Sequence, residues 1–437
     1  MVRVALATLG CKVNQYESAG MAETLREDGY APVPFAGEAD IYIINTCTVT
    51  GKADFQSRQL IRRAVRNNPR AAILVTGCYA QLLPEEISRL PGVTMVAGNV
   101  EKGDILGLVR AMAAGVKRAV EGDIRRVTEF STPAAGVFAG RTRAFLKIQD
   151  GCDSFCSYCV VPHGRGKSRS LAAKDVLERL QAMSAAGHRE LVLTGISLGA
   201  YGRDLRPAAD LLGLLRQVAT IKQLPRLRLS SLEPLEITDA LLAFIRDQGI
   251  LCRHLHIPLQ SGSDRILAEM GRDYDGAFFR RLVHKIQTYL PDAAIGSDVM
   301  VGFPGEGETE FQHTRQLVEE LPLAYLHVFS YSPRPGTPAA ALPDQVRGVD
   351  KKRRASIIRQ LGMKKRDDFA RQFLGRELTV LLESKRDRET GLMRGFSSNY
   401  LPVTVRNGQP SLADTLVTVL AEEITEGKLM GRVIHHD

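Results

Sequence analysis

A chain of 437 residues is too long for one ordinary domain and is expected to divide into two or three. Its 44% apolar and 24% charged residues indicate an ordinary globular protein, and without any run of 18 apolar residues no membrane-spanning helix is expected. Lys and Arg outnumber Asp and Glu by 58 to 49, and the net charge of +9 favours an anionic partner such as nucleic acid.

Cysteine usage points to a reducing compartment and to metal or redox chemistry. The chain holds seven cysteines, an odd number, and three of them share one short motif. The N-terminus opens into a strand-like apolar stretch and not into a secretory signal, so we expect a cytoplasmic protein with no membrane partner. Disulfides are rare in the cytoplasm, so the thiols are expected to be free to bind metal or to react.

The first 125 residues alternate short apolar runs with segments of helical periodicity. Helices are predicted for Asn14–Asp28 and Lys52–Asn68. Strands and helices in alternation are typical of a doubly wound α/β domain with a parallel sheet. The predicted strands are Val2–Leu9, Asp40–Thr46, Ala71–Gly77 and Val93–Asn99.

A second alternating series follows a predicted linker, residues 126–140, which is rich in Thr, Gly, Pro and Ala. Helices are predicted for Ala172–Ala186 and Asp239–Gln248. About six strand–helix units without a nucleotide-type G-x-G-x-x-G predict a full or partial (β/α) barrel over residues 141–371. The predicted strands are 143–149, 190–195, 226–231, 254–259, 294–302 and 326–332.

The chain ends in a basic segment and a small β region. Residues 351–371 hold nine basic and two acidic residues in a predicted helix. Residues 372–437 contain several short strands separated by turn residues, which predicts a small β-barrel. Because this last region has eight basic and nine acidic residues, the helix is the better candidate for binding phosphate, with a solvated surface as the alternative.

Three cysteines of the first domain, Cys11, Cys47 and Cys78, each follow a predicted strand. A parallel fold should bring them together at the carboxyl edge of the sheet, where α/β folds bind ligands. A single buried cysteine is most often a small core residue, as we expect for Cys252, but packing explains three at equivalent positions poorly. We therefore predict one site from these three thiols, called here the N-terminal triad.

A second group, Cys152, Cys156 and Cys159, forms a C-x3-C-x2-C motif directly after the first predicted barrel strand. We call it the barrel triad. This spacing can direct three thiolates at three corners of an iron–sulfur cube and leaves the fourth iron open. With His163, the same residues could instead make a closed four-ligand zinc site. The position at the end of a barrel strand, where catalytic sites lie, favours the open cluster.

The barrel triad resembles the signature of radical S-adenosylmethionine (SAM) enzymes. Together with Tyr158 it matches C-x3-C-x-aromatic-C, in which the open iron binds the amino and carboxylate groups of SAM and the aromatic residue packs near its adenine. The resemblance places SAM across the strand ends of the barrel, where ordinary strand-end hydrogen bonding is the alternative role for each polar group. The residues expected to contact SAM there are Thr194, Gly195, Ser230, Glu233 and Gln260.

The resemblance extends over nearly the whole chain. The stretches that carry it are TLGCKVNQYES, NTCTVTGKAD, VTGCYAQ, KIQDGCDSFCSYCVVPHGRGKSRS, LTGISLGAYG, HIPLQSGSD, DVMVGFPGE and SYSPRPGTPA. They are similar to the methylthiotransferase family of radical SAM enzymes. That family has an N-terminal domain with a second 4Fe-4S cluster, a radical SAM barrel and a C-terminal TRAM domain, which matches the predicted division into 1–125, 141–371 and 372–437.

The family resemblance implies two 4Fe-4S clusters and two molecules of SAM in each turnover. The cluster on the barrel triad would generate the 5′-deoxyadenosyl radical. The cluster on the N-terminal triad would hold the sulfur that is methylated by the other SAM and then inserted into the substrate. The resemblance also implies an electron donor and a sulfur source as further partners.

Within the family, GCKVNQ around Cys11 and NTCTVT around Cys47 are most similar to the bacterial branch that acts on N6-threonylcarbamoyladenosine next to the anticodon of tRNA. This implies the anticodon stem-loop as partner and the 2-methylthio derivative as product. Two alternatives share the fold, namely methylthiolation of N6-isopentenyladenosine or of an aspartyl residue in a ribosomal protein. A third, from another class, is a non-catalytic zinc-dependent RNA-binding protein.

Two sets of arginines are candidates for binding RNA. Arg58, Arg62 and Arg66 recur every four residues in the second predicted helix and share one face. Arg165 and Arg169 follow the barrel triad and could bind phosphate or the carboxylate of the threonylcarbamoyl group. A solvated face is the alternative for both sets.

Overall fold

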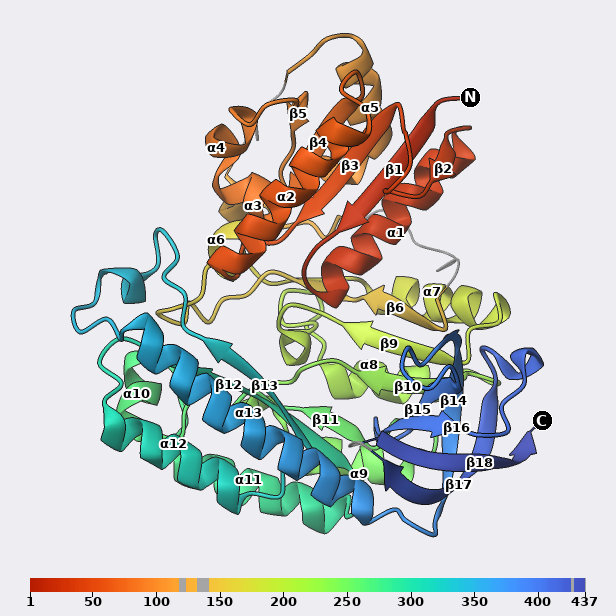
Figure 1. Ribbon diagram of the computed structural model, residues 1–437, viewed down its shortest axis with the longest axis vertical. Helices are drawn as coiled ribbons and strands as arrows, with labels where there is room; N and C mark the ends of the chain where they lie inside the picture. Colours follow the sequence, from red (N-terminus) through yellow and green to blue (C-terminus); the bar gives the residue numbers. More distant parts are fainter. Residues whose placement is uncertain (118–122, 132–140, 426–427, 437) are drawn as a thin grey trace.

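The computed structural model describes residues 1–117, 123–131, 141–425 and 428–436. Three parts follow one another along the chain: an α/β domain at the top of Figure 1, a large barrel below it and a small barrel at the lower right. Most of the predicted linker, residues 126–140, lies outside the described residues. Among the described residues, no helix is both long enough and apolar enough to cross a membrane.

The first domain is a five-stranded parallel sheet in the order β2-β1-β3-β4-β5, as the alternating pattern predicts. All four predicted strands are present, and only the three-residue edge strand β2 was not predicted. The elements are β1 (Arg3–Thr8), α1 (Lys12–Glu27), β2 (Ala31–Val33), β3 (Ile41–Thr46), α2 (Gly51–Asn67), β4 (Ala72–Gly77), α3 (Cys78–Leu82), α4 (Pro84–Ser88), β5 (Met95–Val96), the 3-10 turn η1 (Glu101–Asp104), α5 (Ile105–Ala113) and η2 (Ile124–Arg126).

Helices cover both faces of this sheet because its central strand β3 is apolar on both sides. Ile41 and Ile43 pack in one cluster with α1 and α5, and Tyr42 and Ile44 pack in another with α2, α3 and α4. Successive side chains of a strand point to opposite faces, so a continuous apolar run requires a cover on each. The sheet is therefore doubly wound.

The second part is a barrel of six strands, each at a predicted position. The strands are β6 (Arg143–Lys147), β9 (Glu190–Thr194), β10 (Arg226–Leu229), β11 (His254–His256), β12 (Ala294–Val301) and β13 (Tyr325–Ser330). The helices are α6 (Val161–Arg165), α7 (Ala173–Ala185), α8 (Leu211–Val218), α9 (Asp239–Asp247), α10 (Asp264–Glu269), α11 (Gly276–Tyr289), α12 (Glu308–Glu320) and α13 (Gly348–Arg371). Shorter pieces are β7 (Gln149–Asp150), β8 (Arg169–Ser170), η3 (Leu198–Ala200), η4 (Pro234–Glu236) and η5 (Pro338–Ala341).

The barrel is partial. Strands β6, β9 and β10 pair in parallel, as do β11, β12 and β13, and a bridge between Leu227 and Leu251 joins the two groups. Within the described ranges, no pairing joins β13 back to β6. The barrel is therefore open between these two strands in the part of the chain that the structure describes.

The basic helix α13 packs against the outer face of β13. A Cβ atom on Gly362 would lie 3.2 Å from Cβ of Leu326, so glycine allows the helix to approach the strand closely. Arg354 is buried in an ion pair with Glu306 at 2.8 Å. This arginine of the predicted phosphate-binding surface is therefore used inside the protein.

The C-terminal part is a closed five-stranded barrel, as predicted for a TRAM domain. Its strands are β14 (Glu377–Arg386), β15 (Met393–Ser397), β16 (Pro402–Val405), β17 (Leu416–Thr425) and β18 (Lys428–His436), with the 3-10 turn η6 (Pro410–Leu412) between β16 and β17.

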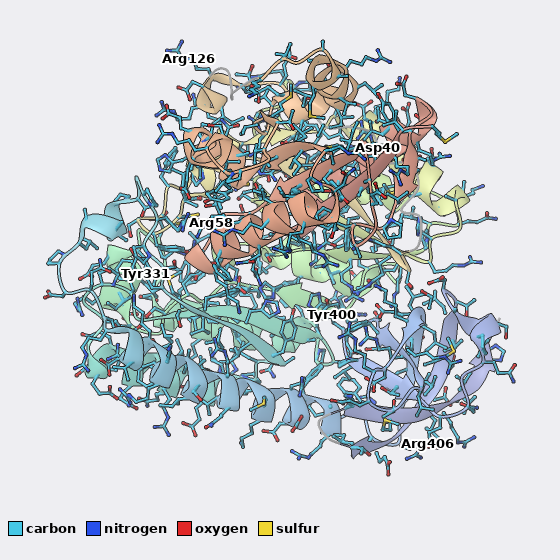
Figure 2. All side chains as sticks on the ribbon, turned by 45° about the horizontal axis from the view of Figure 1, so that its top comes forward. Asp40, Arg58, Arg126, Tyr331, Tyr400 and Arg406 are labelled. Atoms are coloured by element: carbon cyan, nitrogen blue, oxygen red, sulfur yellow. The ribbon has the colours of Figure 1, made fainter. Side chains whose placement is uncertain are left out.

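Two buried arginines attach this small barrel to the large one. Arg226 and Arg228 pair with Glu190 at 2.6 and 2.8 Å and also donate to main-chain oxygens of the β15 end, at Phe396 and Ser398. The Arg228 guanidinium lies 4.9 Å from the ring centre of Tyr400. Figure 2 shows Tyr400 near the middle of the molecule, where the three parts meet.

Candidate active site between two cysteine triads

The fold brings the N-terminal triad together at one edge of the first sheet. Strands β1, β3 and β4 are parallel neighbours, and Cys11, Cys47 and Cys78 come shortly after their carboxyl ends. Burial, followed by the nearby Cys78 thiol, raises the pKa of Cys47 to about 12, so these thiols lie within electrostatic reach of one another. Cys47 is buried, whereas Cys11 borders open space.

An arginine and an amide hold the third cysteine of this triad. Arg165 Nε donates to Cys78 Sγ at 3.3 Å, and Asn99 Nδ2 approaches the same sulfur at 3.7 Å. A cysteine binds metal as a negatively charged sulfur, and a guanidinium that donates to the sulfur can offset that charge. Cys78 therefore has a cationic neighbour suited to a metal ligand.

The spacing of the cysteines fits a cluster better than one zinc ion. Among the described residues, the one group of three metal-binding side chains whose ligand atoms all lie within 4.8 Å of one another is His256, Asp298 and His327. Two sulfurs bound to one zinc ion are at most about 4.6 Å apart, because each Zn–S bond is about 2.3 Å. The sulfurs of each triad are thus spread too widely for a single zinc ion, as the corners of an iron–sulfur cube would be.

Gly10, next to Cys11, provides a test of the N-terminal triad. Its φ is +104°, and an added Cβ would lie 2.8 Å from Cβ and 3.1 Å from Sγ of Cys47. We expect Gly10→Ala to displace Cys47 and to remove roughly four irons per chain after anaerobic reconstitution, as measured by metal analysis. Gly29→Ala is the matched control, because Gly29 has φ +87° and no atom within 4 Å of an added Cβ. Equal iron loss in both variants would show that backbone strain alone is responsible.

The barrel triad opens into a cavity of about 360 Å³. Cys152, Cys156 and Cys159 all line it, and Tyr158 lies beside them. Burial raises the pKa of Cys159 to about 12 in the absence of metal. His163, the fourth residue of the alternative zinc set, does not line this cavity, and its ring packs edge-on against Phe155.

Arg272 is a functional candidate that sequence reasoning missed. Its Nη1 donates to Cys156 Sγ at 3.4 Å, and its Nη2 pairs with Glu233. It thus holds a cation against the barrel triad, as Arg165 does against the N-terminal triad. Arg272 lies between α10 and α11, 116 residues along the chain from Cys156, in a segment without any recognisable motif.

The structure divides the residues expected to contact SAM into two groups. Tyr158, Glu233 and Gln260 line the cavity, whereas Thr194, Gly195 and Ser230 are not among its lining residues. The Thr194 carbonyl accepts the main-chain N–H of Ile148 at 3.0 Å and so has a partner inside the fold. Other lining residues from later strands are Ser231, Asp298, Met300, Phe329 and Tyr331.

The first domain closes one side of this cavity. Val49 and Thr50, which follow Cys47, are among the lining residues. Arg334, in the loop after β13, donates to Thr48 and Asp54 at 2.6 Å each and so connects the large barrel to the first domain. The segment that carries Cys47 therefore continues directly into the wall of the cavity at the barrel triad.

Arg165 and Arg169, which were predicted to bind RNA or a substrate carboxylate, do not lie on an accessible surface, because both side chains are buried. Arg165 is 0% exposed and pairs with Glu17 at 2.5 Å and with Asp150 at 3.4 Å. Arg169 is 5% exposed and donates to the Arg165 carbonyl at 2.9 Å. Arg165 connects the two domains, because its partner Glu17 belongs to the first domain, whereas Arg169 pairs with Asp150 of the barrel.

Two of the three arginines predicted to share a face of α2 are exposed to solvent, and the third has partners within the protein. Arg62 and Arg66 are exposed. Arg58 instead donates to Tyr79 Oη at 2.6 Å and to Glu86 at 3.2 Å. Its position on α2 is labelled in Figure 2.

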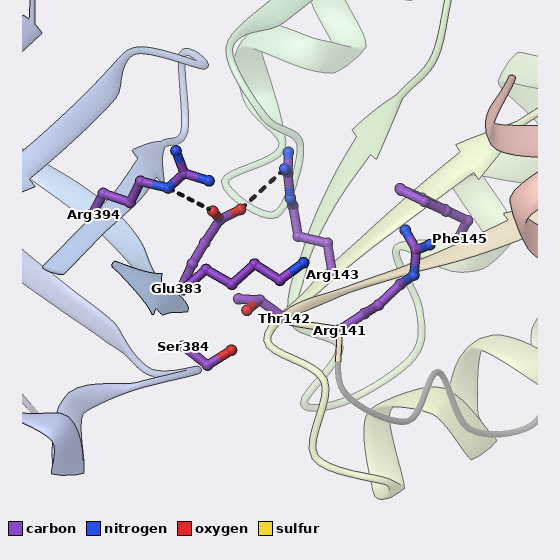
Figure 3. A pocket seen from close by; sticks show the side chains of 8 residues that line it. Arg141, Thr142, Arg143, Phe145, Glu383, Ser384 and Arg394 are labelled. Atoms are coloured by element: carbon purple, nitrogen blue, oxygen red, sulfur yellow. Dashed lines mark hydrogen bonds and ion pairs between the residues drawn. The ribbon is translucent and has the colours of Figure 1, made fainter. Parts of the chain in front are cut away.

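A cationic pocket lies between the two barrels and has a volume of about 370 Å³ (Figure 3). Its charged residues are four cations and one carboxylate: Arg141, Arg143, Lys385, Arg394 and Glu383. The Glu383 carboxylate lies between two of the arginines, 3.3 Å from Arg143 and 3.5 Å from Arg394. These residues come from segments some 240 positions apart, so no local pattern could reveal the pocket.

Two segments of the chain match known protein families. Residues 3–98 match the family described as "Uncharacterized protein family UPF0004", and residues 146–318 match the "Radical SAM superfamily".

Two curated relatives are similar over almost their whole length. Both carry the name "Threonylcarbamoyladenosine tRNA methylthiotransferase MtaB". The protein from Bacillus subtilis is 39% identical, over 98% of this chain and 99% of its own. The protein from Thermotoga maritima is 36% identical, over 99% of this chain and 100% of its own.

Among solved structures, the fold is similar to the radical SAM methyltransferase TsrM from Kitasatospora setae in complex with tryptophan and a SAM analogue. The TM-score is 0.57 at 16% identity, over 78% of this chain and 75% of that one. At this identity the likeness concerns the fold alone.

Proposed function

Because this chain belongs to the methylthiotransferase family of radical SAM enzymes, we propose that it adds a methylthio group to C2 of N6-threonylcarbamoyladenosine next to the anticodon of tRNA. The support for this substrate is the similarity of the whole chain to relatives named for it. Enzymes of this family use SAM and two 4Fe-4S clusters. We assign one cluster to each triad and propose that two SAM molecules are used, one as methyl donor and one as radical source.

The observation that carries the proposal is the continuity between the two triads. The residues that follow Cys47 line the cavity into which Cys152, Cys156 and Cys159 open. The chemistry supplied there is reductive cleavage of SAM at the barrel triad and provision of sulfur at the N-terminal triad. Both must reach the same carbon, and the segment that follows Cys47 brings the N-terminal triad close to the cavity of the barrel triad.

The protein's own residues have three tasks in this arrangement. Arg165 and Arg272 each donate to a cysteine sulfur and place a positive charge beside their triad. Phe329 and Tyr331 line the cavity with aromatic rings on which a base can stack. Val49 and Thr50 close one side and limit the access of water.

We propose that RNA phosphates bind at two cationic surfaces, the exposed arginines of α2 and the pocket between the two barrels. The first has Arg62 and Arg66. The second has four cations around one carboxylate, so its net charge favours an anion. Loop bases are already partly unstacked, so moving one into the cavity costs less than from a duplex. A tRNA substrate and reduced thiols fit a protein that works in the cytoplasm.

Mass spectrometry of tRNA nucleosides from cells with and without this protein tests the proposal. The expected result is loss of 2-methylthio-N6-threonylcarbamoyladenosine in the deletion strain, with accumulation of its precursor, and recovery when the protein is restored. Loss of the isopentenyl analogue would assign the other tRNA substrate. Unchanged tRNA together with loss of a methylthiolated ribosomal protein would overturn the proposal.

A further inference from the structure

His256, Asp298 and His327 form a hydrogen-bonded group on the inner face of the large barrel. Asp298 Oδ1 lies 2.9 Å from His256 Nε2 and 3.3 Å from His327 Nδ1. Tyr325 Oη extends the group, at 3.1 Å from His256 Nδ1 and 2.8 Å from His254 Nε2. His256 is buried, whereas the His327 side chain is 55% exposed. A continuous polar chain therefore runs from the interior to one accessible imidazole.

This imidazole lies on the same strand face as the aromatic wall of the cavity. Alternate residues of β13 and its continuation share one face, so His327 is followed by Phe329 and Tyr331. Both aromatic residues line the cavity of the barrel triad, and so does Asp298, the partner of His327. The triad loops lie at the carboxyl ends of the strands, and each two-residue step along β13 is about 6.6 Å. Of His327, Phe329 and Tyr331, His327 therefore lies farthest from the barrel triad.

Positive charge exceeds negative charge around this polar chain. Lys12 directly follows Cys11, and no other described residue forms a hydrogen bond or ion pair with its ammonium. Lys12 and Arg228 both act electrostatically on His254, at the inner end of the polar chain, and the acidic group that acts on Lys12 is Glu190. Glu190 is already shared by two arginines. An acidic group from a ligand would therefore be stabilised here.

We propose that His327, oriented by Asp298, binds the carboxylate of the threonylcarbamoyl substituent. This rests on the proposed function. C2 and C6 of adenine lie on either side of N1. If C2 of the base faces the triads, its N6 substituent therefore points away from them, along the side chains of β13 and its continuation, from Tyr331 through Phe329 to His327. Nδ1 of His327 is turned to Asp298, so Nε2 is the ring nitrogen left for a ligand. An imidazole that carries a proton on both nitrogens can donate from one to Asp298 and from the other to a ligand carboxylate.

The three side chains also meet the distance condition for binding a metal ion, which is the competing interpretation. Against it, both ring nitrogens of His256 already have hydrogen-bond partners, Asp298 and Tyr325. A metal ion would have to break at least one of these contacts.

The test measures the affinity of the reconstituted enzyme, without reductant, for three anticodon stem-loop RNAs. The three RNAs differ only in the nucleoside next to the anticodon, which is N6-threonylcarbamoyladenosine, its methyl ester or unmodified adenosine. We expect the wild type to prefer the free acid over the ester by about tenfold to a hundredfold, the range for a hydrogen bond to a charged group. His327→Leu should lose this preference. His313→Leu, on the exposed face of α12, is the matched control and should keep it.

Each outcome of this experiment has a distinct meaning. If the wild type distinguishes acid from ester and His327→Leu does so equally well, the role of His327 is refuted while the proposed function stands. If the wild type binds all three RNAs alike, the proposed function is refuted and this inference with it. A stoichiometric divalent metal that is lost in His327→Leu would make the group a metal site. Iron content shows that each variant is intact, and His327→Gln replaces the leucine variant if that one loses iron.

Discussion

Glu17→Gln is expected to lower the free energy of unfolding by about 3–5 kcal/mol, because it leaves several buried cations without their main anion. The Glu17 carboxylate is 1% exposed and lies 2.5 Å from Lys102, 2.9 Å from Lys147 and 2.5 Å from Arg165. The glutamine amide has the shape of the Glu17 carboxylate but lacks the negative charge that offsets Lys102, Lys147 and Arg165. Anaerobic chemical unfolding of the reconstituted protein, followed by circular dichroism, measures the loss.

Low pH should reduce this difference between the wild type and the variant. Burial alone would raise the pKa of Glu17, but Arg165, Lys102 and Lys147 outweigh it and hold the pKa well below its ordinary value. The stabilisation is therefore complete above the ordinary glutamate pKa of about 4.3 and is lost as the pH falls toward the lower pKa of the folded state. A difference that stays constant down to acid pH would show that charge is not its cause.

An exposed ion pair provides the control for Glu17→Gln. Glu320 pairs with Arg280 at 2.6 Å on the surface, where its side chain is 43% exposed. Glu320→Gln should change the free energy of unfolding by less than about 1 kcal/mol, because water screens the pair. If both substitutions had the same effect, the buried network would have no special role in stability.

The network around Glu17 also relates the two triads in space. Glu17 comes from α1 of the first domain, whereas Lys147 and Arg165 come from β6 and α6 of the large barrel. Arg165 contacts both this carboxylate and Cys78 Sγ. The helix α6 that carries it begins two residues after Cys159. One arginine thus links the loop of the barrel triad to a cysteine of the N-terminal triad.

The sequence was sufficient to predict the strands and the two triads because their signals are local. An apolar run bounded by turn residues defines a strand such as β3, and a short spacing defines the barrel triad. The convergence of the N-terminal triad could be predicted because parallel neighbouring strands end at the same edge. Each of these inferences depends only on residues close in the chain and on one rule of topology.

The roles of the arginines could not be predicted in the same way. Arginine is usually exposed, so Arg165 was expected to face RNA. Its burial depends on Glu17, which is 148 residues away in the chain. Arg272 and the cationic pocket between the barrels likewise depend on partners from distant segments. No periodicity records such pairings, because each partner alone looks like an ordinary surface charge.

Cys152→Ala is expected to abolish both 5′-deoxyadenosine formation and methylthiolation of tRNA. Cys152 is one of three thiols that face the cavity, and His163, the nearest alternative ligand in sequence, does not line it. The N-terminal triad does not depend on Cys152, so iron should fall from roughly eight to roughly four per chain instead of disappearing. Methyl transfer from SAM to protein-bound sulfur should persist, which liquid chromatography of the quenched reaction can measure together with 5′-deoxyadenosine.

Two further cysteine variants separate loss of a cluster ligand from a general effect of removing a thiol. Cys78→Ala should show the reverse pattern, in which SAM cleavage persists and methyl transfer is lost. Cys252 is buried in the core near Arg228 and Glu190, away from the cavity, so Cys252→Ala should keep both activities and all the iron. If Cys152→Ala still formed 5′-deoxyadenosine at the wild-type rate, the division of labour between the triads would be wrong. The two clusters would then have to be assigned the other way round.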